Sequence, residues 1–287
     1  MNNYVLMTDS SCDIDRATLQ EWGVPSAELW FAFTDEEKEY TGVDMPEKEF
    51  YAAMRSGRVA KTSAVNSQTF VLFFEPYLKQ GLDILYLGFS SGLSTTVHSA
   101  ETAAKELSER YPDRTIRVVD TLCASTGQGL LVWLTLKKKN AGASLDEAAE
   151  FAENTKLHID HWFTVSDLIY LKRGGRINAL SYFAGTALNV KPVLHVDNEG
   201  HLINMFKVRG RKASVKALAD KLAELAVNKE GEYFICNGDC PEDVEYLQDL
   251  LEKTTGHRAN RVEYTGAVIG AHSGPGTLAL FFVGRER

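Results

Sequence analysis

A short segment rich in glycine and serine follows an apolar run, and its pattern suggests nucleophilic chemistry. Residues 84–87 are apolar, and Gly88-Phe89-Ser90-Ser91-Gly92 then matches G-x-S-x-G, the turn on which serine hydrolases place their nucleophile. Asp239 or Asp243 and then His272 follow in the chain order of a triad, although the H-G-G-G oxyanion segment of many esterases is missing. A serine esterase or acyl hydrolase that uses Ser90 and His272 is therefore one hypothesis.

The same turn carries more hydroxyl groups than a single nucleophile requires. The hydroxyl residues after the apolar run are Ser90, Ser91, Ser94, Thr95 and Thr96. They precede a predicted helix, whose free backbone N–H groups and dipole attract a carboxylate or a phosphate. A second hydroxyl pair lies in Lys61-Thr62-Ser63-Ala64, a segment predicted to connect two helices. Anion binding is thus a second hypothesis for the turn, and ordinary helix capping by one serine is another.

One histidine stands among residues that restrict or free the backbone. It is His272, in Ile269-Gly270-Ala271-His272-Ser273-Gly274-Pro275-Gly276, and the glycines and the proline predict a defined, tightly packed turn. The imidazole could donate to a carboxylate, move a proton or be satisfied within the core. A basic segment, Lys172-Arg173-Gly174-Gly175-Arg176, favours the first role because an arginine stays charged and pairs with anions. This segment also fits the end of a helix, with Gly174 just beyond the last turn.

Motifs for metal and nucleotide chemistry are missing from the sequence. It contains no P-loop, H-E-x-x-H or G-x-G-x-x-G pattern. Cys236 and Cys240 form a C-x3-C pair, and a redox or metal module built on them is a further class of function, but neither the spacing nor nearby ligands support it. His158 and His161 lack a third ligand. We therefore expect no metal ion and no cofactor.

Composition and charge narrow the class of partners. The chain has 287 residues with 31 Lys and Arg against 39 Asp and Glu, which gives a formal net charge of -8. This surplus of acidic groups argues against general binding of nucleic acid or of acidic lipid surfaces. Neither a signal peptide nor an apolar run of membrane-spanning length is visible. We expect a cytoplasmic protein with no integral membrane segment.

Strand and helix patterns alternate through the first half of the chain. Strands are expected at residues 4–7, 27–33, 84–89 and 116–119, and helices at 15–22, 67–79, 95–107 and 125–138. Capping boxes are expected at Asp44-Met45-Pro46-Glu47 and Ser144-Leu145-Asp146-Glu147. The alternation predicts a mainly parallel sheet, whose carboxyl edge would gather the hydroxyl-rich turns.

The pattern changes after about residue 158. A hairpin at residues 191–208, a strand at 233–236, and helices at 212–226 and 241–254 predict an α+β arrangement. The sequence thus predicts an α/β protein of two lobes that share a cleft, the first spanning residues 1–157 and the second residues 158–287.

Seven short motifs, taken together and in order, resemble the DegV family of bacterial proteins. They are Thr8-Asp9-Ser10-Ser11, Lys61-Thr62-Ser63, Ser90-Ser91-Gly92-Leu93-Ser94, Val119-Asp120-Thr121 with Ala124-Ser125, residues 170–177, Val208-Arg209-Gly210 and His272-Ser273-Gly274-Pro275-Gly276. Each motif is weak alone, but the set covers the whole chain. The resemblance implies two DegV-like α/β domains with a ligand tunnel between them that holds a long-chain fatty acid.

The resemblance also implies roles for particular residues. Thr62, Ser63 and Ser94 would bind the fatty-acid carboxylate, and Arg173 and His272 would complete its polar network. No catalytic residue is implied, so the protein would be a lipid-binding carrier and not an enzyme. Its partner would be a separate ATP-dependent fatty acid kinase, which phosphorylates the presented carboxylate for phospholipid synthesis.

Two departures from the family pattern fall within these motifs. Ala64-Val65 replaces a usual Gln-Pro, and Thr95 replaces a usual glycine, so that Thr95 either crowds the head group or adds a donor to it. The acyl chain would still dominate affinity, because burying about fourteen methylenes at ~0.8 kcal/mol each yields roughly 11 kcal/mol before ordering costs. The hydroxyl groups would then set the orientation of the ligand.

Overall fold

The first half of the chain builds a four-stranded parallel sheet, as the alternating pattern predicts. The computed structural model describes residues 3–177 and 189–287. The strand order is β2 (Ser26–Ala27), β1 (Tyr4–Asp9), β6 (Asp83–Gly88) and β7 (Ile116–Asp120). The helices around this sheet are α1 (Arg16–Trp22), α3 (Ser67–Lys79), α4 (Thr96–Arg110), α5 (Thr126–Asn140) and α6 (Leu145–Thr155).

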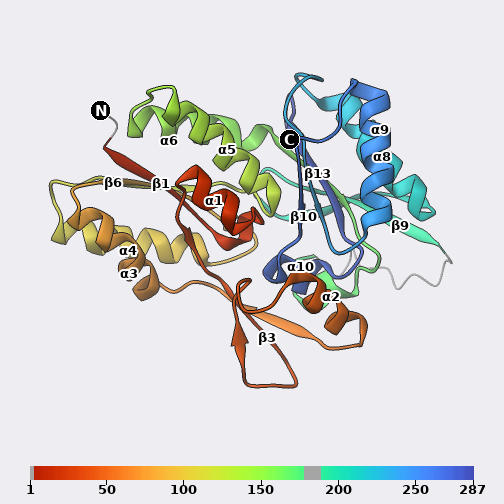
Figure 1. Ribbon diagram of the computed structural model, residues 1–287, viewed down its shortest axis with the longest axis horizontal. Helices are drawn as coiled ribbons and strands as arrows, with labels where there is room; N and C mark the ends of the chain where they lie inside the picture. The colour runs from red at the N-terminus through yellow and green to blue at the C-terminus, as the bar shows by residue number, and fades with distance from the viewer. Residues whose placement is uncertain (1–2, 178–188) are drawn as a thin grey trace.

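Alternate side chains of this sheet face different helices. Val5 and Met7 of β1 pack in one buried cluster with α3 and α4, whereas Tyr4 and Leu6 pack in another with α5 and α6. Figure 1 shows the two helix pairs on opposite faces of the sheet. Because both faces are covered, the strands read as continuous apolar runs in the sequence.

The second half builds a six-stranded mixed sheet. Its strand order is β10 (Leu202–Arg209), β9 (Val190–Val196), β8 (Ile159–Thr164), β13 (Leu278–Val283), β11 (Phe234–Asn237) and β12 (Arg261–Tyr264). Two longer helices, α8 (Arg211–Leu225) and α9 (Pro241–Thr255), cover one face, and side chains of the other face pack with α5. This arrangement confirms the expected two-lobed α/β fold with a mainly parallel first sheet. The boundary between residues 157 and 158 stays a prediction.

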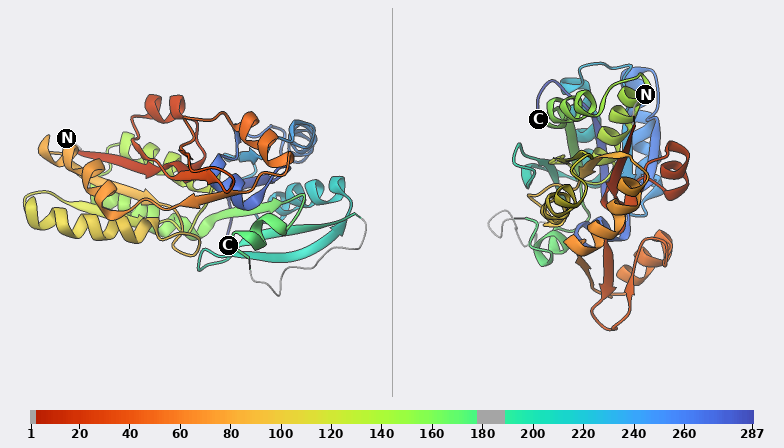
Figure 2. Two further views of the ribbon diagram at one scale, coloured as in Figure 1. Left: turned by 90° about the horizontal axis from the view of Figure 1, so that it is seen from below. Right: turned by 90° about the vertical axis from the view of Figure 1, so that its left-hand side faces the viewer.

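A small third sheet was not expected from the sequence. It consists of β4 (Glu39–Tyr40), β3 (Trp30–Phe33) and β5 (Ala60–Ser63), and it protrudes with α2 (Glu47–Arg55) from the rest of the chain in Figures 1 and 2. The predicted single strand at residues 27–33 is therefore wrong, because the chain leaves the first sheet after Ala27 and enters this one at Trp30. Residues 61–64 lie between α2 and α3 as expected, but Lys61, Thr62 and Ser63 also pair antiparallel with β3, which the sequence did not predict.

Helix caps confirm one prediction and correct another. The Ser144 side chain and Glu147 form the expected capping box of α6, and Asn66 caps α3. The capping box expected at Asp44 is wrong. The Asp44 carboxylate accepts hydrogen bonds from the backbone N and Oγ1 of Thr41, at 2.7 and 2.8 Å, so it closes the preceding turn and leaves α2 without a side-chain cap.

Three short helical segments complete the described chain. They are η1 (Ser10–Cys12), η2 (Lys156–His158) and α7 (Ile169–Arg173). The remaining helix, α10 (Ala267–Ser273), directly precedes β13. Within residues 3–177 and 189–287, no helix combines the length and the apolar character that crossing a bilayer requires.

Candidate functional site

A cavity of about 370 Å³ lies between the loops of the first lobe and one face of the second sheet. This volume falls within the range of small-molecule pockets. Its floor on the second sheet consists of His161, Phe163, Val196, Leu202, Cys236, Ala279 and Phe281. The β6–α4 turn, the β7–α5 turn, the end of β5, and α10 supply most of the other walls. Both halves of the chain thus contribute to the cavity, as the expected tunnel requires.

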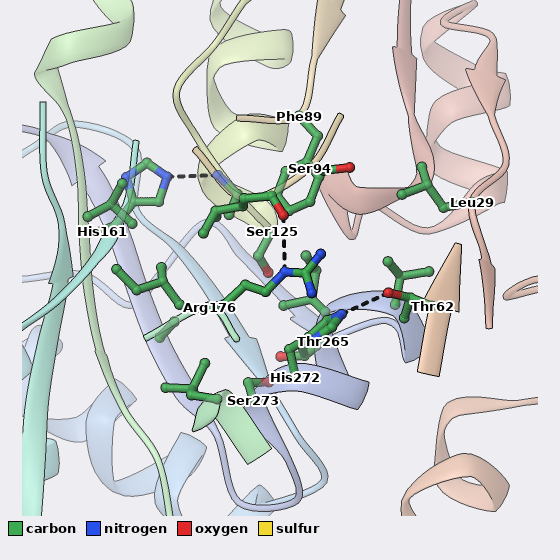
Figure 3. A pocket seen from close by; sticks show the side chains of 18 of the residues that line it. Leu29, Thr62, Phe89, Ser94, Ser125, His161, Arg176, Thr265, His272 and Ser273 are labelled. Atoms are coloured by element: carbon green, nitrogen blue, oxygen red, sulfur yellow. Dashed lines mark hydrogen bonds between the residues drawn. The ribbon is translucent and has the colours of Figure 1, made fainter. Parts of the chain in front are cut away.

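Two predicted residues from distant parts of the chain meet at the rim of this cavity. Thr62 Oγ1 and His272 Nε2 are hydrogen-bonded at 2.8 Å, although 210 residues separate them in sequence (Figure 3). Strand β5 positions Thr62 opposite Phe31 of β3, and α10 carries His272. Ser63, the next residue of β5, also lines the cavity and is exposed. This side of the cavity is therefore a hydroxyl-bearing opening.

The predicted hydroxyls of the β6–α4 turn line the same cavity. Ser94 Oγ accepts a hydrogen bond from the backbone N of Thr96 at 3.2 Å and lies 2.9 Å from Thr96 Oγ1. Ser94 thus satisfies one free N–H at the start of α4, although the N-cap residue itself is Thr95, which makes no side-chain capping bond. Thr95 lines the cavity and is exposed. An anion here would meet Ser94 and Thr95 at the positive end of α4.

The imidazole of His272 is neutral near pH 7 in this environment. Burial, followed by the positive charge of Arg176, lowers the pKa of His272 to about 4. Its Nδ1 is buried and has no hydrogen-bond partner in the described chain. The ring lies directly against Gly174, where a methyl group would be 2.1 Å from Nδ1. Gly174 therefore gives His272 the space to reach Thr62.

Arg176, and not Arg173, lines the cavity. Arg173 is the last residue of α7 and its side chain is exposed. The chain then turns through Gly175, whose φ of 68° favours glycine, and brings Arg176 under the β6–α4 turn. There the Nε of Arg176 donates to the backbone oxygen of Leu93 at 3.1 Å, and burial lowers the pKa of the guanidinium. The sequence motif contained both arginines, and only the path of the turn distinguishes them.

The G-x-S-x-G segment has a structural role at the junction of the lobes. Ser90 is fully buried, and its Oγ donates to the backbone oxygen of Gly200 in the β9–β10 turn at 2.9 Å. Gly92 lies so close to this turn that a Cβ would be 2.8 Å from the backbone oxygens of Glu199 and Gly200. The segment therefore docks the first lobe onto a hairpin of the second.

The residues of the hypothetical triad make separate interactions. His272 bonds to Thr62 and Ser90 bonds to Gly200, while Asp239 pairs with Arg55 and Asp243 pairs with Arg211. The four cysteines are free thiols. Within the ranges described, no group of three or more His, Cys, Asp or Glu residues is arranged to hold a metal ion.

The interior of the cavity is largely apolar, which the sequence did not reveal. Phe89, Leu93 and Ala124 form a buried cluster against which Leu202 and Ile269 pack. These five residues come from four separate segments, so no periodic pattern within one element marks them as a group. A cavity with such walls and a hydroxyl-bearing opening suits an elongated apolar ligand with a polar or anionic end.

Two α/β lobes around such a cavity define a class of two-lobed ligand-binding proteins. The family model described as "Uncharacterised protein, DegV family" matches residues 3–285. A DegV domain-containing protein of Clostridium perfringens is 41% identical over 287 residues, which cover 99% of this chain and 98% of that protein. The chain therefore belongs to the DegV family.

Solved structures of this family share the fold across the whole chain. A stearic acid-binding protein from Eubacterium ventriosum superposes with a TM-score of 0.88 at 26% identity, covering 98% of each chain. A DegV family protein from Thermus thermophilus, described by its fatty acid binding, has a TM-score of 0.86 at 29% identity, covering 98% of this chain and 99% of that one. Both related proteins are thus described as binding fatty acids.

Proposed function

We propose that this protein binds a long-chain fatty acid in the cavity between its lobes. The observation that carries the proposal is the Thr62–His272 hydrogen bond at the opening of a largely apolar cavity. Thr62, Ser63, Ser94 and Thr95 offer hydroxyl donors to the carboxylate, and His272 offers an imidazole without adding a second buried charge. The fatty-acid binding of structural relatives supports the same ligand class.

The positive charge that balances the carboxylate is assigned to Arg176. The resemblance implies Arg173 for this role, but the exposure of Arg173 and the position of Arg176 on the cavity wall favour the latter. Arg176 already donates to the backbone oxygens of Leu93 and Gly174, which fix its guanidinium near Ser94 and His272. Arg176→Gln should therefore weaken binding of palmitate, whereas Arg173→Gln should change it by less than about twofold.

The acyl chain provides most of the affinity in this proposal. Each methylene transferred from water to the apolar walls contributes ~0.8 kcal/mol, whereas a hydroxyl hydrogen bond contributes about 0.5 to 1.5 kcal/mol net. Phe89, Leu93, Phe163 and Phe281 supply much of the wall against which the chain would pack. The opening then selects for an acid and fixes its direction.

We also propose that the bound acid is presented to a separate ATP-dependent fatty acid kinase. Ser63 and Thr95 are exposed where they line the cavity, so a carboxylate held between them would be close to the protein surface. Such a kinase should form acyl phosphate from palmitate faster when this protein is present. Equal rates with and without the protein would remove the carrier role and leave the binding role intact.

Mass spectrometry of lipid extracted from the purified protein tests the binding function. A long-chain fatty acid at near-equimolar amount is expected. Thr62→Val should then weaken binding of added palmitate about tenfold, because it removes a head-group hydroxyl but keeps the shape of the side chain. Thr254→Val is a matched control, since Thr254 is an exposed residue of α9 outside the cavity. Absence of any acyl species together with no binding of added palmitate contradicts the proposal.

A further inference from the structure

The cavity has two ends of different chemical character. Neighbouring strands of a sheet lie about 4.8 Å apart, so β9 and β11, which are separated by β8 and β13, are roughly 14 Å apart. One end, called here the apolar end, consists of Phe89, Leu93, Ala124, Val196 and Leu202. The other, called here the polar end, consists of Ser125, Cys236, Thr265 and Ser273. The alkyl chain of a fatty acid without further polar groups cannot form hydrogen bonds with the side chains of the polar end.

Three residues of the polar end are bonded to one another or to a buried acid. Ser125 Oγ hydrogen-bonds to Asp13 Oδ2 and lies 3.0 Å from Cys236 Sγ. Thr265 Oγ1 donates to the same sulfur at 3.2 Å. All four side chains are at least nine-tenths buried. Their mutual bonds hold the wall in place without any ligand.

Ser273 differs from these three residues. It is 4% exposed, it lines the cavity, and its Oγ has no hydrogen-bond partner in the described chain. The turn after Ser273 is fixed to the end of β11, because Gly276 N donates to Gly238 O at 2.7 Å and Gly238 N donates to Thr277 O at 2.8 Å. An alkyl chain packed here would leave the Ser273 hydroxyl both dehydrated and unpaired, which weakens binding. An oxygen atom on the ligand would satisfy it.

The sequence position of Ser273 limits where this oxygen lies on the ligand. Ser273 directly follows His272, so their Cα atoms are 3.8 Å apart, and Figure 3 shows both side chains at the cavity. With the carboxylate beside His272, an oxygen that reaches Ser273 belongs to one of the first few carbons of the chain. Burial raises the pKa of Asp13 well above its usual range, which shows that the polar end disfavours a negative charge. We therefore expect the ligand oxygen that meets Ser273 to be neutral, in contrast to the carboxylate beside His272.

We propose that the preferred ligand is a fatty acid with a hydroxyl group near its carboxyl end, as in a 3-hydroxy acid, and that Ser273 hydrogen-bonds to this hydroxyl. The inference rests on the fatty-acid-binding function proposed above. The carboxylate stays with Thr62 and His272, the hydroxyl meets the polar end, and the rest of the chain extends along the apolar walls.

Calorimetric titration of the delipidated protein with three acids tests the inference. The acids are palmitate, 3-hydroxypalmitate and 16-hydroxypalmitate, the last of which controls for a hydroxyl at the wrong position. We expect 3-hydroxypalmitate to bind about five- to tenfold more tightly than palmitate. Ser273→Ala should reduce this ratio to about one by weakening 3-hydroxypalmitate. The matched control Ser214→Ala alters a buried serine of α8 that lies outside the cavity, and it should keep the wild-type ratio.

The possible results separate the inference from the proposed function. Equal binding of palmitate and 3-hydroxypalmitate overturns the inference but leaves fatty-acid binding intact, as does a preference that survives Ser273→Ala. Tighter binding of 16-hydroxypalmitate than of 3-hydroxypalmitate also overturns it, because the hydroxyl would then be recognised elsewhere. If none of the acids binds, both the proposed function and the inference fail.

Discussion

Replacing Gly174 with alanine should disable the head-group site while the fold persists. A methyl group at this position would lie 2.1 Å from Nδ1 of His272 and 3.0 Å from its Cγ. Ordinary contacts between such atoms require about 3.5 Å, so the imidazole would have to move by more than 1 Å. The φ of Gly174 is −71°, which alanine adopts without strain, so the side chain of His272 and not the backbone should respond.

This displacement has a calculable effect on binding. The Thr62–His272 distance of 2.8 Å would exceed the hydrogen-bonding range after such a shift. The displaced imidazole would also lose its hydrogen bond to the bound carboxylate. Losing a bond to a charged group costs about 1.5 to 3 kcal/mol, which corresponds to roughly 10- to 100-fold weaker binding of palmitate. Isothermal titration calorimetry measures this change directly. Gly42→Ala is the control, because Gly42 is exposed and an added methyl group meets no atom within 4 Å.

A double-mutant cycle shows whether the effect passes through the imidazole. In a His272→Ala background the added methyl group at Gly174 has no ring to displace, so it should cause little further loss of affinity. Melting temperatures of all variants monitor the fold. If Gly174→Ala binds palmitate with wild-type affinity, Gly174 does not position His272. The same conclusion follows if the loss of affinity is equal with and without His272.

Three further substitutions test the roles of Asp160, Ser90 and Gly274. Burial raises the pKa of Asp160 to about 7, so its contribution to the free energy of unfolding is present below about pH 4 and is lost as pH rises to about 7. Asp160→Asn should therefore reduce the dependence of the free energy of unfolding on pH, measured by urea titrations between pH 4 and pH 7. An unchanged dependence on pH contradicts this assignment. Ser90→Ala should destabilise the protein by about 1 to 2 kcal/mol through loss of the hydrogen bond to Gly200, yet keep palmitate binding. Labelling of wild-type Ser90 by a fluorophosphonate would instead support the esterase hypothesis. Gly274→Ala should lower the melting temperature, because its φ is 82° and a Cβ would lie 2.2 Å from the ring of Tyr170; an unchanged melting temperature opposes this expectation.

Local sequence patterns predicted the elements whose signals are local. The strands β1, β6 and β7 were visible as apolar runs, and the capping box at Ser144 was visible as a spaced pair of residues. The small third sheet was invisible because β5 pairs with a strand about thirty residues earlier, and its residues do not alternate between apolar and polar types.

The site shows the same division between local and distant information. The hydroxyls of Thr62, Ser63, Ser94 and Thr95 were found from their motifs, and the structure brings them to one cavity. Which of two arginines enters that cavity depends on a turn through Gly175, and motif position alone cannot specify it. The unpaired hydroxyl of Ser273 likewise results from packing among α10, β11 and β13, which are distant in sequence.

A crystal structure of the protein with bound palmitate would show directly whether the fatty acid occupies the cavity between the lobes. We expect the carboxylate to lie within hydrogen-bonding distance of Thr62 and His272, with Ser94 beside it and the acyl chain extending towards Phe89 and Leu202. A carboxylate bound at Ser125 and Thr265, or a palmitate outside the cavity, would contradict this expectation.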